Sequence, residues 1–385
     1  MARKYFSLHH RFLAWIGRLT NTIILSPHPV SIGNASEDYY FGLLKARKEG
    51  KKLVVLFPFE MPGRFKIRMF DPAILFLESD LLAMKYRSPV SLLLSGIFTS
   101  YFIIAAILSY LFIQFRTTHP LFRFNMAYYW RPLAGQDILW RPDAGQIKFD
   151  WALARDQDWG TQFSTPLELS LPKNMTALCE AEQALMRLPH DAWFVCLHVR
   201  EGGYKGDWDS PLNADINNYL GAIKEIVQQG GWVVRMGDPS MTKFPSSDKV
   251  IDYAHSHSRR AIMDIYLIGE CRFYLGSSTS LKDTAFLLNK PMVIANQIQW
   301  INSMPRRHGD ITLFRHVYSK VENRFLSLQE WLLRAADITA ESWGSPDWHF
   351  FENSNEEIAS AVKEMMDPNR ETEPTYLQKE FRKAH

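Results

Sequence analysis

The sequence has little cysteine. Its 385 residues include three, Cys179, Cys196 and Cys271, an odd number with no CxxC spacing. A structural zinc site and a disulfide framework are therefore not indicated, because both need cysteines in pairs or clusters. Three isolated thiols are typical of small buried side chains in a reducing compartment.

The sequence also lacks a large excess of charge of either sign. Its 44 basic and 41 acidic side chains give a formal net charge of +3. These charges are interspersed, which argues against nucleic acid as the main partner, because nucleic-acid-binding domains carry a basic patch or stripe. The composition is that of a folded protein, and the length allows two domains of ordinary size.

The charge at the start of the chain is unevenly placed. Four basic residues, Arg3, Lys4, Arg11 and Arg18, precede the first acidic residue, Glu37. Apolar residues are interleaved with them. The pattern predicts that residues 1–20 form a basic amphipathic segment on an anionic membrane surface. The alternative is an ordinary surface helix that packs on the body of the protein.

A long uncharged stretch spans residues 88–115, between Arg87 and Arg116. Crossing a bilayer takes about 20 apolar residues, so we expect this segment to interact with a membrane. A single crossing would separate the two halves of the chain, and the basic residues on both flanks give no orientation. We therefore expect a re-entrant or in-plane hairpin, bent near Gly96 or Ser100, which holds a peripheral or monotopic protein on the cytoplasmic face of the inner membrane. A helix buried in a large domain is the alternative.

Residues 21–87 have the pattern of the first part of an N-terminal α/β domain. The β-rich runs TIILS and KKLVVLFPFE flank the helical pattern EDYYFGLLKARKEG. This order predicts a strand, a helix and a second strand, with Ser36 capping the helix and Gly50 ending it. Residues 116–190 are expected to complete this domain and to link it to the next.

Residues 191–366 alternate regularly between apolar strands and helices. The strand-like runs are AWFVCLHV, WVVRM, KVIDYA, RFYLG and PMVIAN. Near-continuous apolar strands separated by helices predict an α/β domain with a doubly wound parallel sheet that is buried on both faces. Two further helices are expected near LSLQEWLLRAA and EEIASAVKEMM, and residues 367–385 are expected to form a loose polar tail.

Polar side chains follow three of these strands. Ligands of an open parallel sheet bind outside the carboxyl ends of its strands, so the three clusters belong to one edge. They are His198, Arg200 and Glu201 after AWFVCL, Arg235, Gly237 and Asp238 after WVV, and Ser277, Ser278 and Thr279 after RFYLG.

The chemistry of these clusters suits phosphate. The last cluster opens a helix, whose N–H groups and hydroxyls can hold a diphosphate at the positive end of the helix dipole. A capping box of Ser280 and Asp283 explains the same residues without a ligand. Arg200 and Arg235 need anionic partners, and a guanidinium suits phosphate oxygens. The alternative partners are acidic side chains of the same domain, Glu201, Asp238 or Asp264.

The order and spacing of several segments resemble a known family. FVCLHVRE, WVVRMGD, VIDYAHS and CRFYLGSSTS, with Asp264 in the intervening helix, are similar to bacterial surface-polysaccharide glycosyltransferases of GT-B architecture. These enzymes are distantly similar to fucosyltransferases, whose first motif is His-x-Arg, here His198 to Arg200. The resemblance covers residues 191–297.

The resemblance implies two Rossmann-like domains, with a nucleotide-diphosphate sugar bound to the C-terminal one. Arg200 would contact the diphosphate and stabilise the leaving-group charge without a metal or another cofactor. The residues expected to line the nucleotide site are Arg235, Gly237, Asp238, Asp264, Ser277, Ser278 and Thr279. Fucosyltransferases commonly continue with a second arginine and an acid, whereas Glu201 and Gly202 stand here. This departure leaves the sugar and the nucleotide open.

An inverting transfer also needs a base for the acceptor hydroxyl, unless the leaving phosphate takes the proton. Glu201 is the first candidate, followed by Asp207 and Asp209. His198 is either a packed, hydrogen-bonded residue or, by the resemblance, part of the catalytic group. Asp207-Trp208-Asp209 matches a metal-binding DxD pattern, but chance produces this pattern readily, so no metal is expected.

The leading hypothesis is a membrane-associated, inverting, metal-independent glycosyltransferase. It would move a sugar from a nucleotide donor to a lipid-linked or surface glycan. A polysaccharide pyruvyl transferase, which has a similar two-lobed fold, is a second hypothesis, and a non-catalytic scaffold that kept the fold is the third. Arg200, Arg235 and residues 277–279 converging on one space would favour an enzyme, whereas internal pairing of these side chains would favour the scaffold.

Overall fold

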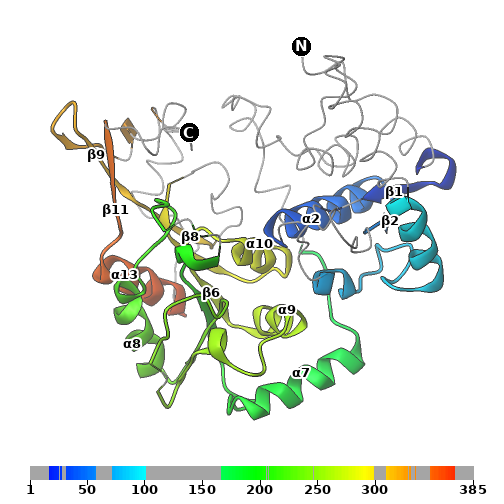
Figure 1. The fold of residues 1–385 in the computed structure, drawn as a ribbon, viewed down its shortest axis with the longest axis horizontal. Coiled ribbons are helices and arrows are strands. Elements are labelled where there is room, and N and C mark those ends of the chain that lie inside the picture. Colours follow the sequence, from blue (N-terminus) through cyan, green and yellow to red (C-terminus); the bar gives the residue numbers. More distant parts are fainter. Residues whose placement is uncertain are drawn as a thin grey trace. The chain divides into compact units, whose positions relative to one another are not determined.

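The computed structural model describes residues 17–25, 27, 32–57, 72–100, 166–298, 309–330, 334 and 347–368, except 205, 207, 246 and 328. The chain divides into two compact units (Figure 1). The N-terminal unit is Met1–Gln146 with Leu167–Thr176, and the C-terminal unit is Ile147–Pro166 with Ala177–His385. The helix α7 (Lys173–Leu185) crosses this boundary, which falls earlier than residue 190.

The N-terminal unit contains the predicted strand, helix and strand. β1 (Thr22–Leu25) and β2 (Lys52–Val55) pair in parallel, and α2 (Ile32–Lys48) connects them. Ser36 lies inside α2, where its hydroxyl donates to the Ile32 carbonyl at 2.8 Å, so the predicted cap is wrong. Gly50 follows the helix with φ at 61°, a left-handed conformation that favours glycine at a helix end.

The apolar stretch is described as far as residue 100. Residues 89–100 are helical without interruption at Gly96, whose carbonyl accepts from the Ser100 hydroxyl at 3.0 Å. Within the described ranges, no helix is long and apolar enough to cross a membrane. Residues 101–115 lie outside these ranges, so the expected hairpin stays a prediction.

The C-terminal unit is built on a parallel sheet of six strands in the order β5-β4-β3-β6-β7-β8. The strands are β3 (Phe194–His198), β4 (Trp232–Arg235), β5 (Val250–Ile251), β6 (Phe273–Gly276), β7 (Met292–Gln297) and β8 (Ile311–Phe314). The five predicted strands are present, with KVIDYA reduced to a two-residue strand, and β8 was not predicted. The chain leaves β3 toward β4 and returns to the other side of β3 as β6, which makes the sheet doubly wound.

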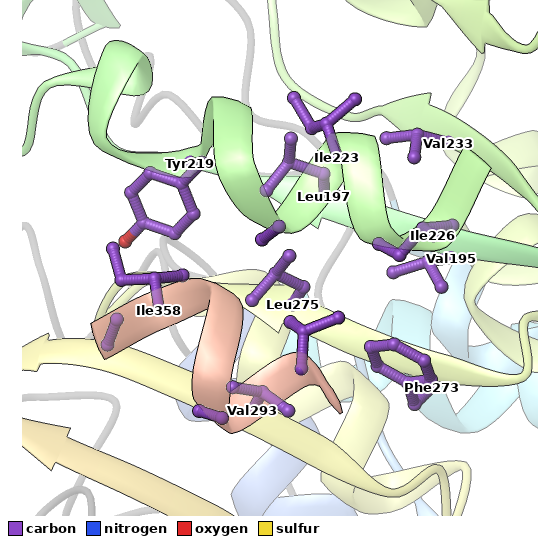
Figure 2. Close-up of a cluster of buried hydrophobic side chains, with 14 of the residues drawn as sticks. Val195, Leu197, Tyr219, Ile223, Ile226, Val233, Phe273, Leu275, Val293 and Ile358 are labelled. Atoms are coloured by element: carbon purple, nitrogen blue, oxygen red, sulfur yellow. The ribbon is translucent and has the colours of Figure 1, made fainter. Parts of the chain in front are cut away.

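Helices cover both faces of this sheet. α8 (Leu220–Gln228) and α13 (Asn355–Met366) pack on one face in a single apolar cluster (Figure 2). That cluster includes Val195, Leu197, Phe273, Leu275 and Val293 from strands, and Ile223, Ile226 and Ile358 from the helices. α9 (Ala261–Glu270) and α10 (Ser280–Leu287) lie on the other side of β6 (Figure 1). Strands buried on both faces explain the continuous apolar runs in the sequence.

The segment after β8 differs from the prediction. It contains an antiparallel sheet in the order β10-β9-β11, formed by β9 (His316–Ser319), β10 (Arg324–Phe325) and β11 (Trp348–Phe351). The predicted helix α13 follows and starts with a capping box of Ser354 and Glu357. The helix predicted near LSLQEWLLRAA, residues 1–16 and most of the predicted tail lie largely or wholly outside the described residues.

Candidate functional site

The strands β3 and β6 are neighbours at the point where the order of the sheet reverses. Their last residues, His198 and Gly276, are paired in the ladder. The next residues carry the two polar clusters, and the Arg200 amide donates to the Ser277 hydroxyl at 2.9 Å. Open α/β sheets bind ligands at such a switch point, outside the carboxyl ends of the strands. The structure therefore brings these two predicted clusters together, and Arg235 of the third cluster reaches Glu201 of the first at 2.8 Å.

The side chain of Arg200 is half-buried and oriented by the following loop. Its Nε donates to Asn213 Oδ1 at 3.2 Å, and its backbone carbonyl accepts from the Ala214 amide at 3.0 Å. Backbone and side chain are thus both fixed at the edge of the sheet. A guanidinium in this position is suited to bind an anion.

Arg235 has a role that differs from ligand binding. Its side chain is fully buried, with Nη1 donating to Asp252 at 3.0 Å and Nη2 to Glu201 at 2.8 Å. These are internal ion pairs of the kind that the scaffold hypothesis predicts. Buried charges need such partners, and the two carboxylates occupy both terminal nitrogens of this guanidinium.

Both carboxylate oxygens of Glu201 accept hydrogen bonds from within the protein. Oε1 accepts from Arg235, and Oε2 accepts from the Thr242 amide at 2.7 Å. Asp252 is held similarly, with Oδ2 accepting from the Phe244 amide at 3.0 Å. The network connects the loop after β4 to the site and gives Glu201 a structural role, and its role as the base stays a prediction.

His198 belongs to a buried hydrogen-bonded chain. Its Nδ1 lies 2.9 Å from the Thr279 hydroxyl, which in turn lies 2.9 Å from the Tyr274 hydroxyl. Burial, together with the nearby charges of Arg235 and Arg200, lowers the pKa of His198 to about 4. A neutral imidazole with so low a pKa is a poor proton acceptor, which favours the packed, hydrogen-bonded alternative, and a catalytic role of His198 stays a prediction.

The start of α10 does not contain the predicted capping box. Thr279, not Ser280, occupies the N-cap position, and its side chain makes no capping hydrogen bond. The hydroxyl is directed instead to His198 and Tyr274. The half-buried Ser278 lies between this residue and Ser277, at the positive end of the helix dipole.

Three other predicted residues make local contacts. The Gly237 carbonyl accepts from Arg259 Nε at 2.7 Å, and Asp238 Oδ1 accepts from the Ser240 amide at 2.9 Å. Asp264, in the first turn of α9, accepts from the Tyr253 hydroxyl at 2.7 Å. Each contact stabilises a turn or a helix start, so none of the three requires a ligand.

The DxD pattern is only partly visible. Asp209 is exposed, and Asp207 lies outside the described residues. Among the residues that the structure describes, no group of three His, Cys, Asp or Glu side chains is arranged to hold a metal ion.

Sequence reasoning missed two residues of the site, Asn213 and Arg315. Asn213 Oδ1 accepts from Arg200, and the Asn213 backbone carbonyl accepts from Arg315 Nη2. Arg315 follows β8, and the strand-end rule would have found it if the short run ITLF had been recognised as a strand. Asn213 lies in a loop with no periodic pattern, so no sequence signal indicates its role.

The comparisons with known proteins identify no family for this chain. No family model and no curated protein matches it. Solved structures are similar at low identity. A glycosyl transferase family 9 protein from Veillonella parvula DSM 2008 is 9% identical, covers 89% of this chain and 96% of its own, and gives a TM-score of 0.44. The E. coli ADP-heptose lps heptosyltransferase II is 12% identical, covers 90% of this chain and 100% of its own, and gives a TM-score of 0.42.

A spinosyn forosaminyltransferase is 14% identical, covers 91% of this chain and 97% of its own, and gives a TM-score of 0.28. All three proteins are sugar transferases by name, the class expected from the sequence. Scores below 0.5 at these identities carry no argument about the activity of this chain, which rests on its own residues. The resemblance to fucosyltransferases stays a prediction.

Proposed function

We propose that the protein is a glycosyltransferase that binds the diphosphate of a nucleotide sugar at the switch point between β3 and β6. The observation that carries this proposal is the contact of the Arg200 backbone amide with the Ser277 hydroxyl, which brings the residue that carries the guanidinium next to the turn that leads into α10. Both features favour negative charge, and both would act on the leaving diphosphate without a metal. Arg200 is the arginine of the proposal because its backbone is fixed at the switch point.

The acceptor step is proposed more narrowly. Glu201 and His198 are engaged within the protein, so Asp209 in the exposed loop is the proposed base for an inverting transfer. Proton transfer to the leaving phosphate is the alternative route. The proposed acceptor is a lipid-linked or surface glycan.

Thermal-shift measurements test the donor site. The screen uses sugar conjugates of ADP, GDP, UDP, dTDP and CMP, with phosphoenolpyruvate as a further ligand. A ligand at 100 times its dissociation constant adds about 2.7 kcal/mol of stability, so one nucleotide sugar should raise the melting temperature of the unit by about 5 °C or more. Arg200→Ala should abolish this rise, because it removes the proposed diphosphate contact.

The matched control is Arg272→Ala. Arg272 precedes β6, lies exposed at the opposite edge of the same sheet, and stacks on Trp193 at 4.6 Å. It should keep the full ligand response. No response of the wild type to any nucleotide sugar, or an equal response in the two variants, would contradict the proposal. A response to phosphoenolpyruvate alone would indicate the pyruvyl transferase instead.

The helix at residues 89–100 supports the membrane part of the proposal. A surface helix of a soluble domain buries its apolar side chains and exposes its polar ones, whereas this helix exposes several apolar side chains. Two of its serines are buried, and three apolar side chains are more than half exposed: Ser91 1%, Ser95 2%, Val90 55%, Leu93 65% and Ile97 60%. Arg87, exposed just before this helix, adds a cation beside the apolar face. We propose that this face contacts an anionic membrane surface on the cytoplasmic side, where a lipid-linked acceptor would lie.

Co-sedimentation with vesicles tests this surface. Leu93→Glu with Ile97→Glu should weaken binding to vesicles that contain phosphatidylglycerol by about tenfold or more, because each apolar side chain contributes about 1.5–3 kcal/mol when buried. The matched control is Leu178→Glu with Leu185→Glu, two exposed leucines on α7, which should bind as the wild type does. Equal binding of both double variants would contradict the proposed surface.

A further inference from the structure

Two arginines from different strand ends contact the same residue of the loop after β3. Arg200, after β3, donates from Nε to Asn213 Oδ1 at 3.2 Å. Arg315, after β8, donates from Nη2 to the Asn213 backbone carbonyl. β3 and β8 are separated in the sheet by β6 and β7, so Asn213 links the ends of two strands that are not neighbours.

Asn213 also organises its own loop. Its side-chain amide donates to the Trp208 carbonyl at 3.0 Å, and its backbone amide donates to the Ser210 carbonyl at 2.9 Å. The loop returns to the sheet at Ala214, whose amide donates to the Arg200 carbonyl at 3.0 Å. The position of Oδ1 relative to Arg200 therefore depends on a compact turn rather than on one rotamer.

Arg315 is placed to hold this turn and not to bind a ligand itself. Its side chain is 7% exposed, and burial lowers its pKa, with Glu352 opposing that effect. Its amide donates to the Gln297 carbonyl at 2.9 Å, which fixes its backbone to the end of β7. A buried guanidinium on a fixed backbone is a rigid donor for the Asn213 carbonyl.

Glu352 completes the support from the C-terminal segment. Its Oε1 lies 3.6 Å from Arg315 Nη2. Its Oε2 accepts from the Asp215 amide at 2.9 Å and from Asn218 Nδ2 at 3.0 Å, on the far side of the same loop. The loop therefore contacts two side chains of opposite charge, Arg315 and Glu352.

We infer that Arg315 is a positioning residue that acts through Asn213 to orient the guanidinium of Arg200 toward the switch point. An arginine side chain has about 2 kcal/mol of rotamer entropy, so an acceptor fixed at Nε reduces the entropy lost when the two Nη atoms bind an anion. The link from Arg315 through Asn213 to Arg200 follows from the contacts described. Its role in binding a diphosphate rests on the proposed function. Sequence position alone places Arg315 more than a hundred residues from Arg200, which is why only the fold reveals the link.

The first test measures the orientation of Arg200 without any nucleotide. Hydrogen exchange of the Arg200 Nε–H is followed by ¹⁵N nuclear magnetic resonance, with the signal assigned by its loss in Arg200→Lys. A hydrogen bond to a charged group is worth about 1.5–3 kcal/mol, so Asn213→Ala should speed exchange by about tenfold or more. Arg315→Met should act in the same direction, and Arg315→Lys should restore part of the protection, since an ammonium can donate to the Asn213 carbonyl.

The second test measures binding of the nucleoside diphosphate, ADP, GDP, UDP or dTDP, whose sugar conjugate responds in the thermal screen. Calorimetry should show binding about tenfold weaker in Asn213→Ala and in Arg315→Met. In an Arg200→Ala background, the same two changes should raise the dissociation constant by less than about twofold, because their effect passes through Arg200. Arg324→Met is the matched control, since Arg324 forms ion pairs in an exposed sheet.

The two tests separate the two proposals. If both Asn213→Ala and Arg315→Met leave the Arg200 Nε–H exchange unchanged, the positioning role is overturned whatever the nucleotide data show. Additive losses of binding in the Arg200→Ala background also overturn it. If exchange responds as expected but no nucleoside diphosphate binds the wild type, the positioning role holds and the proposed function fails. Circular dichroism confirms that each variant is folded before either measurement.

Discussion

Arg235→Ala is expected to destabilise the C-terminal unit by about 3–5 kcal/mol, because removing one partner of a buried ion pair leaves the other charge uncompensated. Arg235 is fully buried and is paired with Glu201 and Asp252, whose side chains are 14% and 7% exposed. The variant would leave both carboxylates without their cation. It would also release the Thr242 and Phe244 amides, which these carboxylates hold.

Urea denaturation, monitored by tryptophan fluorescence, measures the decrease in the free energy of unfolding of the C-terminal unit. Arg324→Ala is the control, because Arg324 also pairs with two carboxylates, Glu322 and Glu330, but in an exposed sheet. Exposed ion pairs contribute little, so the control should leave the transition nearly unchanged. Equal effects of the two variants would show that the Arg235 network does not stabilise the unit.

The strands at the centre of the C-terminal sheet could be predicted because their apolar runs are continuous. β3, β4, β6 and β7 are almost completely buried, and Gly230 and Asn289, both with positive φ, follow the ends of α8 and α10. β8 and β9 were missed because each has four residues and partial exposure, so neither a continuous run nor a clear alternation is visible. Short strands of this kind are defined by their neighbours rather than by their own sequence.

The strand-end rule found Arg200, Ser277 and Thr279, and the fold brings these three to one edge. It could not distinguish the role of Arg200 from that of Arg235. Arg235 is the last residue of β4, and its partner Asp252 comes from the far end of a loop. Whether a guanidinium at a strand end pairs with a buried carboxylate is a tertiary property, so the sequence left internal ion pairing open as the alternative to a ligand for both arginines.

The cap predicted at Ser36 failed for a related reason. Serine is common both at N-caps and inside helices, where its hydroxyl donates to the carbonyl four residues before it. Ser36 is fully buried within α2 and makes that contact with Ile32. The start of the helix was set by a segment of weaker pattern, which local propensity could not identify.

Gly276→Ala is expected to destabilise the C-terminal unit by about 3 kcal/mol or more, because overpacking against backbone cannot be relieved by a side-chain rotation. A Cβ at Gly276 would lie 2.3 Å from the His198 carbonyl oxygen, on the neighbouring strand. That carbonyl accepts from the Ser277 amide at 3.1 Å, and the strands are in register at this point. β3 and β6 would have to separate where the proposed diphosphate site begins.

Gly269→Ala is the control for this prediction. Gly269 lies in α9, and its nearest neighbour to an added Cβ is Leu288 at 3.9 Å, so alanine fits and favours the helix. Denaturation should therefore show a loss for Gly276→Ala and no loss for Gly269→Ala. Nucleotide binding at a temperature where both variants are folded should be lost only in Gly276→Ala, because the contact between Arg200 and Ser277 spans the two displaced strands. Full binding by Gly276→Ala would place the donor site away from the switch point.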